Sequence, residues 1–166
     1  LVNGYGPRGT KYLPVSAQDV LQTFWPFGPD AGGAFLAFGG LKWPGLKVTR
    51  LSAASGQVKG TVTIQDGQGS PANSVVITAR DFGVDATRVS AIITANADDA
   101  TKRDLRLLAT YTDQDGVTRN GYDVTYPAFQ ASNGTVTDPG DRYFTVTKAS
   151  GATHAAAAGT YPIASG

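Results

Sequence analysis

The chain has 166 residues, of which 41% are apolar and 16% are charged, so we expect one folded domain of ordinary size with many turns, or one and a part. The net charge of +1 argues against a nucleic-acid binder and a polybasic membrane surface, and no run approaches the roughly 18 apolar residues of a membrane span. Because Cys is absent, no disulfide, thiolate nucleophile or zinc–cysteine site can form.

Two short helices are predicted in the first fifty residues. Ser16 and Asp19 have the spacing of a capping box, with Asp where Glu or Gln is more usual. Apolar residues follow on one helical face, and Pro26 ends the helix because the residue before proline avoids the α region. A second helix is predicted over residues 31–38, where two glycines then stop it. Residues 46–51 indicate a strand.

After Ser52 the pattern changes to short β-strands. Apolar and polar residues alternate or form compact apolar runs, and turn residues separate the runs. The predicted strands cover residues 61–65, 75–79, 88–95, 105–112, 121–126 and 143–147. The predicted turns are Asp66-Gly67, Asp115-Gly116, Asn120-Gly121, Asn133-Gly134 and Pro139-Gly140. Residues 155–158 fit one helical turn or a loop.

This order of elements predicts a mainly β fold of the α+β class. A short N-terminal α/β portion with two helices would precede an antiparallel β-sandwich or barrel, because short strands at this spacing are typical of both architectures.

A glycine-rich motif near the start satisfies G-x-G-x-x-G over residues 4–9. A dinucleotide site also needs a strand before the motif and a helix that opens within it. Pro7 and Arg8 stand where that helix would begin, and no βαβ unit follows. The motif therefore indicates a glycine turn, and no cofactor is expected.

His154 is the only histidine, and its sequence context favours no catalytic or metal site. A hydrolase triad would need a G-x-S-x-G elbow, which is absent, and a metal site would need carboxylates around the imidazole. The nearest candidates are Asp98-Asp99 and Asp113-x-Asp115-Gly116, the second resembling half of a calcium loop. All thirteen acidic residues are Asp, a turn-forming residue, so we interpret both candidates as hairpin turns. No catalytic, cofactor-binding or metal-binding residue is predicted.

Large aromatic residues cluster between positions 25 and 43, and they could stack on sugars or bases. Their helical spacing favours a packed core or a subunit contact. The residues are Trp25, Phe27, Phe35, Phe38 and Trp43. Asn133-Gly134-Thr135 matches a glycosylation sequon, but an ordinary turn is the favoured interpretation.

The order of several short motifs resembles the N-terminal part of contractile tail sheath proteins. A Gly-Pro-x-Gly start leads to a capped helix ending in Phe-Gly, a second helix ending in Gly-Gly and a strand. The residues that carry the resemblance are Gly6–Thr10, Leu13–Ser16, Phe27-Gly28, Phe35–Gly40, Lys47–Leu51 and Val76–Gly83. Leu105–Leu107 and Gly121–Val124 resemble later strands of the family, and Tyr161–Gly166 resembles the approach to a further family motif.

The resemblance implies three parts: residues 1–52 as a piece of the family's α/β domain, residues 53–150 as a β-sandwich, and residues 151–166 as a return segment. It implies a fragment without the family's N-terminal arm and C-terminal domain. The family's C-terminal domain would follow the return segment.

The function implied is structural. The subunit would polymerise around a tail tube and contract to drive the tube through the host envelope, with the β-sandwich on the outer side. The implied partners are copies of itself in helically stacked hexameric rings, the tail tube protein and baseplate proteins, without nucleic acid or membrane insertion. Its location would be the virion tail sheath, and the host cytoplasm during assembly. The alternative is a β-sandwich binding module, for virion decoration or carbohydrate, which exposed aromatics in the 25–43 cluster would favour.

Overall fold

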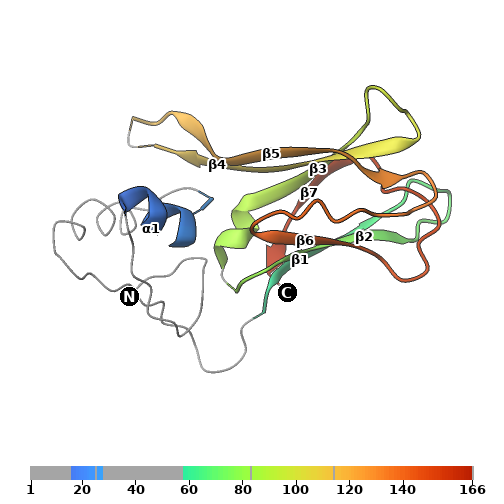
Figure 1. Ribbon diagram of the computed structural model, residues 1–166, viewed down its shortest axis with the longest axis horizontal. Coiled ribbons are helices and arrows are strands. Elements are labelled where there is room, and N and C mark those ends of the chain that lie inside the picture. The colour runs from blue at the N-terminus through green and yellow to red at the C-terminus, as the bar shows by residue number, and fades with distance from the viewer. Residues whose placement is uncertain (1–15, 25, 28–57, 83, 114, 166) are drawn as a thin grey trace.

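The computed structural model describes residues 16–24, 26–27, 58–82, 84–113 and 115–165. One short helix, α1 (Ala17–Phe24), lies beside a β-sandwich (Figure 1). None of the helices in the described residues is long and apolar enough to cross a membrane.

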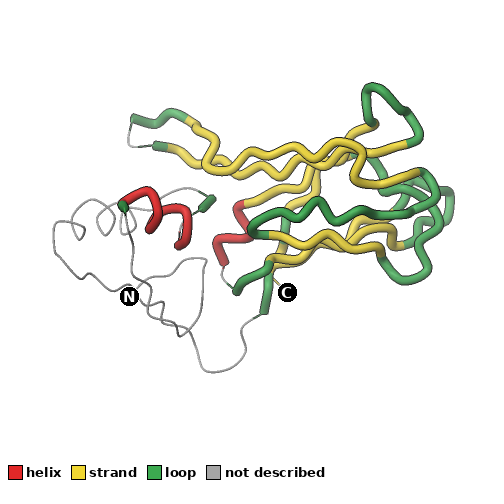
Figure 2. Tube along the Cα trace, viewed as in Figure 1, coloured by secondary structure: helices red, strands yellow, loops and turns green. Residues whose placement is uncertain are grey.

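Eight strands form two antiparallel four-stranded sheets that face each other (Figure 2). The first sheet has the order β6-β2-β1-β8 and the second β5-β4-β3-β7, so the architecture is a sandwich. The strands are β1 (Gly60–Gln65), β2 (Asn73–Ala79), β3 (Val89–Ala95), β4 (Lys102–Thr112), β5 (Thr118–Ala131), β6 (Phe144–Lys148), β7 (Gly159–Pro162) and β8 (Ala164–Ser165), and a 3-10 turn, η2 (Val84–Arg88), precedes β3.

The alternation of the sequence places the core between the sheets. Along β4, Leu105, Leu107 and Ala109 are buried, whereas the residues between them are half-buried. On β2 of the opposite sheet, Val75 and Ile77 are buried in the same way. Period-2 burial is what a strand with one face on a core requires, so these strands were predictable from the pattern.

Three sequence-based expectations need correction or remain open. The described residues hold only α1 as an α-helix, so the expectation of two helices is not confirmed. The second predicted helix (31–38) and the predicted strand (46–51) lie outside the described residues. The interpretation of residues 151–166 as a return segment towards a further domain stays a prediction. Within this segment β7 pairs with β3 and β8 pairs with β1.

The Asn120-Gly121 pair lies inside β5 and makes no turn. Asn120 pairs with Thr110 and Tyr122 pairs with Ala109, so Gly121 is an extra residue without a partner on β4. It is a β-bulge, where glycine is favoured for its conformational freedom. Residues 155–158, left open between helix and loop, contain no helical turn.

The N-cap of α1 provides a first test. The Ser16 hydroxyl accepts a hydrogen bond from the Asp19 backbone N–H at 3.1 Å. We expect Ser16→Ala to lower the free energy of unfolding by about 1 kcal/mol, the usual loss for an N-cap, whereas Ser16→Asp keeps the cap. Chemical denaturation of the three proteins measures this. Equal midpoints would show that the cap does not stabilise the fold.

Gly60 provides a second test, because β1 approaches η2 closely at this residue. A Cβ atom at Gly60 would lie 2.9 Å from the Ala86 Cβ and 3.2 Å from the Ile163 side chain. Gly60→Ala should therefore destabilise the protein by about 1–3 kcal/mol through overpacking. Gly69→Ala is the control, since nothing lies within 4 Å of its Cβ. Thermal melts that place both variants at the same midpoint would contradict this packing.

Candidate functional site

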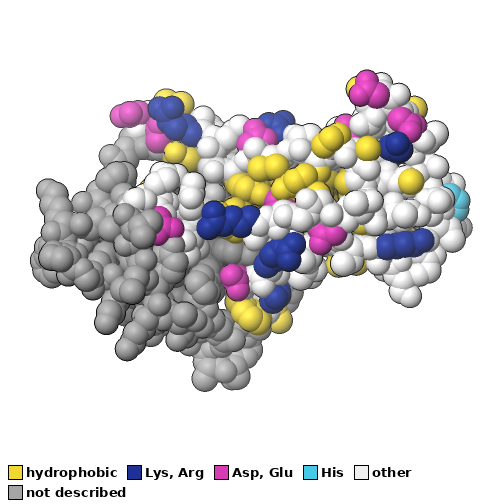
Figure 3. Space-filling view, viewed as in Figure 1, with side chains coloured by type: hydrophobic (Ala, Val, Ile, Leu, Met, Phe, Trp, Pro, Cys, Tyr) yellow, Lys and Arg dark blue, Asp and Glu magenta, His cyan; other side chains and the backbone are white. Residues whose placement is uncertain are grey.

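A groove of about 580 Å³ lies between α1 and β5, and we call it the α1–β5 groove. Among the described residues, four tyrosines, three side-chain amides and one guanidinium line it, together with apolar or small residues. These described lining residues are Tyr111, Tyr122, Tyr126, Tyr143, Gln18, Gln22, Asn120, Arg142, Leu21, Pro26, Gly121 and Val124. Figure 3 shows apolar side chains gathered in the strip between β5 and β6 on this face.

Strand alternation explains why aromatic rings line the groove. Tyr122, Val124 and Tyr126 pair with Ala109, Leu107 and Leu105, so they project to the core side of their sheet. They nevertheless stay only half-buried, because β5 is the edge strand of its sheet. The core face of β5 is therefore partly exposed at these residues.

The buried carboxylate of Asp141 holds these rings in place. The residue is 2% exposed, and its Oδ2 accepts hydrogen bonds from the hydroxyls of Tyr122 and Tyr126. Its Oδ1 accepts from the backbone N–H groups of Tyr143 at 2.6 Å and Phe144 at 2.8 Å. A buried carboxylate needs several such donors to offset the loss of water. Asp141 therefore joins β5 to the start of β6.

Helix α1 is attached to the same cluster. Phe27, 1% exposed, makes edge-to-face contacts with Tyr122 and Tyr143, with ring centroids 5.7 and 5.5 Å apart. The Tyr143 hydroxyl donates to the Gln22 carbonyl oxygen at 2.9 Å, which occupies an acceptor of the helix. Edge-to-face aromatic pairs stabilise beyond the area they bury. One wall of the groove is thus fixed to the sandwich.

The environment of the cluster raises the pKa values of its tyrosines. Burial raises the pKa of Tyr126 to about 12, and the neighbouring Asp141 carboxylate adds to the effect. The same two causes, in the same order, hold the pKa of Tyr122 well above its ordinary value. Burial also raises the pKa of Tyr143. All three phenols thus resist ionisation in the folded state.

A second polar cluster ties the opposite end of β5 to the first sheet. Gln130 and Ser74 are fully buried, and the Gln130 amide donates to the Ser74 hydroxyl at 2.9 Å. Ser74 donates in turn to the His154 carbonyl oxygen at 2.6 Å, and the Gln130 Oε1 accepts from the Ala156 backbone N–H at 2.9 Å. Each polar atom used here has a partner, as buried polar groups require.

His154 lies beside Asp66, a carboxylate that the sequence analysis did not pair with it. Its Nδ1 lies 3.5 Å from Oδ2 of Asp66 and 3.1 Å from the Thr153 hydroxyl. Asp66 is buried, with 5% of the residue exposed. The other Asp66 oxygen accepts backbone N–H groups of Gln68 and Ala72, which shapes the β1–β2 loop. Asp66 and His154 are 88 residues apart, so no local signal could pair them.

The described residues contain no group of three or more His, Cys, Asp or Glu that could hold a metal ion.

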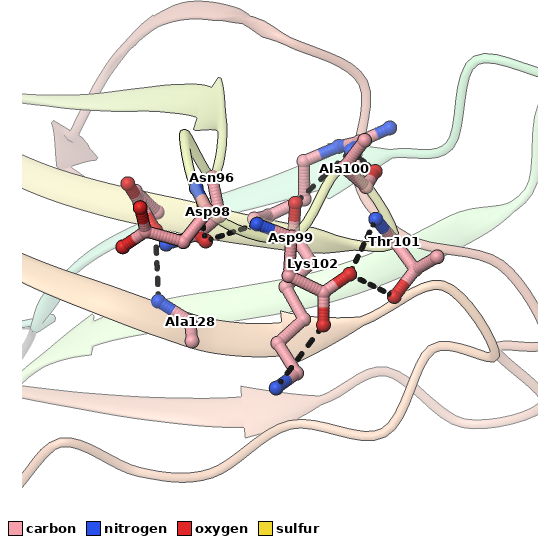
Figure 4. A network of polar contacts seen from close by, with 9 residues as sticks. Asn96, Asp98, Asp99, Ala100, Thr101, Lys102 and Ala128 are labelled. Atoms are coloured by element: carbon pink, nitrogen blue, oxygen red, sulfur yellow. Dashed lines mark hydrogen bonds and ion pairs between the residues drawn. The ribbon is translucent and has the colours of Figure 1, made fainter.

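The two acidic sequence candidates lie in turns of the second sheet. In the β3–β4 turn, the Asp99 carboxylate accepts from the Thr101 hydroxyl and lies 3.3 Å from the Lys102 ammonium (Figure 4). The Thr101 hydrogen bonds and Lys102 lower the pKa of Asp99. In the β4–β5 turn, Asp113 accepts from the Val117 backbone N–H and pairs with Arg119, and both contacts lower its pKa.

The remaining sequence candidates divide between described and undescribed residues. The glycine motif over residues 4–9 and the aromatics Trp25, Phe35, Phe38 and Trp43 lie outside the described residues. Of the aromatic cluster, Phe27 is described and belongs to the core. The sequon residue Asn133 caps its own turn, accepting from the Thr135 backbone N–H.

Sequence reasoning did not identify the α1–β5 groove. The alternation of Tyr122, Val124 and Tyr126 was visible and placed them on one face of a strand. Their common partner, Asp141, lies 15 residues or more further along the chain, in a segment without a periodic pattern. A sequence signal could have predicted the rings but not the carboxylate beneath them.

Comparison with known proteins identifies one structural likeness. No protein-family model matches the sequence, and no curated protein matches it. A solved structure, the sheath tail protein from Desulfitobacterium hafniense, aligns with a TM-score of 0.59 and 21% sequence identity. The alignment covers 98% of this chain and 33% of that protein. The chain has a sheath-like fold. At this identity the likeness concerns the fold alone.

Asp141 gives a stability prediction. Asp141→Ala leaves two phenol hydroxyls and two backbone N–H groups without their acceptor, so the free energy of unfolding should fall by at least about 3 kcal/mol. Asp138→Ala is the control, because its half-exposed carboxylate lies 3.8 Å from Arg80 and should contribute less than about 1 kcal/mol. Urea denaturation compares the two. Similar losses would mean that Asp141 does not hold the cluster together.

The raised tyrosine pKa values give a pH prediction. Below about pH 10 the phenols are neutral in both states, so their full contribution to stability is present. As pH rises from 10 towards 12, the unfolded chain loses these protons first, and stability should fall. Tyr126→Phe should flatten this alkaline decline. Unfolding free energies measured between pH 8 and 12 test it, and an unchanged slope in the variant would refute the assignment to Tyr126.

Proposed function

We propose that this chain is part of a structural subunit of a tail sheath. The observation that carries the proposal is the alignment of 98% of the chain with a sheath tail protein at a TM-score of 0.59. The order of the short sequence motifs supports the same role independently of the fold. A structural role requires no catalytic residue.

The finer proposal concerns assembly. The full-length protein polymerises as hexameric rings stacked helically around a tail tube, bound to baseplate proteins, and contraction drives the tube through a host envelope. Heterologous contacts that do not close generate such open helical assemblies. Contraction would repack contacts between subunits while each domain keeps its fold. The protein would thus belong to the virion tail, after assembly in the host cytoplasm.

A further part of the proposal concerns where the contacts between subunits lie. The chain spans 33% of the Desulfitobacterium hafniense protein. We place the lattice contacts mainly in segments outside these 166 residues, and the β-sandwich on the outer side of the sheath.

Assembly gives the prediction for this proposal. The 166-residue chain should remain monomeric in light scattering, whereas the full-length protein that contains it should form tubes visible by electron microscopy. Immunogold labelling with an antibody against residues 118–131 should decorate the outside of intact tubes, if β5 faces outward.

Each other outcome of these measurements would contradict a part of the proposal. Regular tubes formed by the 166-residue chain alone would show that these residues suffice for the contacts. A full-length protein that never forms tubes or rings would refute the sheath proposal. Tubes that the antibody labels only after disruption would place the sandwich at an internal contact.

A further inference from the structure

We propose that the α1–β5 groove binds a neutral oligosaccharide, a role that goes beyond the sheath function and does not rest on it. The volume of about 580 Å³ falls within the roughly 300–1,000 Å³ of ordinary ligand sites. The lining combines aromatic rings with side-chain amides. Sugars present apolar C–H faces, which can pack on the aromatic rings, and hydroxyl groups, which can hydrogen-bond to the amides.

The rings are held in place before a ligand arrives. The hydroxyls of Tyr122 and Tyr126 are both fixed on Asp141, and Tyr122 packs edge-to-face on Tyr143 with centroids 5.4 Å apart. Arg142 lies over the Tyr143 ring, 5.5 Å from its centroid. Binding to rings that are already ordered loses little side-chain entropy, which favours weakly binding ligands such as sugars.

The amides on the helical wall are available to a ligand. Gln18 and Gln22 are exposed, and their side chains make no hydrogen bond with the part of the chain that the structure describes. Each amide offers two donors and one acceptor oxygen, which is the complement of paired sugar hydroxyls. A purely apolar ligand would leave these groups unused, so the wall favours a hydroxylated one.

Charge and backbone geometry argue against other occupants. Among the described lining residues only Arg142 is charged, so this part of the groove offers an anionic polymer a single cation. An added β-strand would need a regular edge on β5, but the Gly121 bulge and Pro127 interrupt that edge on both sides of Tyr122–Tyr126. Bulges and prolines are the features by which edge strands avoid pairing with other chains.

The experiment uses the 166-residue chain. A glycan array of neutral and acidic oligosaccharides selects the strongest neutral binder, and calorimetry with that oligosaccharide then compares variants. Tyr111→Ala removes a ring at the distal end of β4, beyond the segment paired with β3, and Gln22→Ala removes one amide. Gln65→Ala, exposed on the opposite sheet, is the matched control.

We expect each groove variant to weaken binding by about tenfold or more, and Gln65→Ala to leave it unchanged. Tyr111→Phe, which keeps the ring, should retain most of the affinity. Circular dichroism melts of all variants separate lost binding from lost folding, and Gln22→Ala, an exposed change, serves if Tyr111→Ala unfolds.

The proposal would be overturned if no neutral oligosaccharide binds at millimolar concentration, or if only acidic glycans bind. It would also be overturned if binding survives both variants, or if the chain self-associates and the variants abolish that association. The last result would identify the groove as a contact between copies. Because none of these readouts depends on tube formation, failure here leaves the sheath proposal separately testable.

Discussion

The open side of the sandwich depends on one buried carboxylate. β5 and β6 are edge strands of different sheets, so no ladder of backbone hydrogen bonds can join them. Asp141 takes the place of that ladder: it accepts two phenol hydroxyls from β5 and two backbone N–H groups at the start of β6. Because the low local dielectric strengthens these bonds together, they act as a unit. The docking of Phe27, and with it α1, follows from the ring positions that Asp141 fixes.

A cluster of neutral polar groups links the C-terminal end of β5 to the first sheet. Gln130 reaches across the interior to Ser74 on β2 and to the backbone of Ala156. The first β5 link uses a carboxylate and the second uses an amide, and the two side chains need different hydrogen-bond partners. An amide can satisfy a donor and an acceptor at once, whereas a carboxylate only accepts and needs donors on every side. This explains why tyrosines surround Asp141, while a serine suffices beside Gln130.

The sequence allowed the strands to be predicted wherever burial alternates with period two, as at Val62 and Ile64 or Leu105 and Leu107. It did not reveal β7 and β8, which are only four and two residues long, too short to show a period, and which pair with β3 and β1. It also made Asn120-Gly121 a turn, because the dipeptide chemistry of a turn and of a bulge is the same. For the groove, the rings of Tyr122 and Tyr126 were predictable as neighbours. Asp141 was not, since contacts at long sequence separation leave no local period.

The two proposals require the same stiffness but make opposite demands on the groove. A sheath subunit that repacks its contacts must keep each domain intact, and links from β5 to the other sheet at both ends supply that cohesion. The same links hold the rings ready for a sugar. Yet a groove covered by a neighbouring subunit cannot admit an oligosaccharide, whereas one on the outer surface can. If the β-sandwich lies on the outer side of the sheath and no neighbouring subunit covers the groove, the groove stays open in the assembled tube. Both roles can then coexist in one subunit.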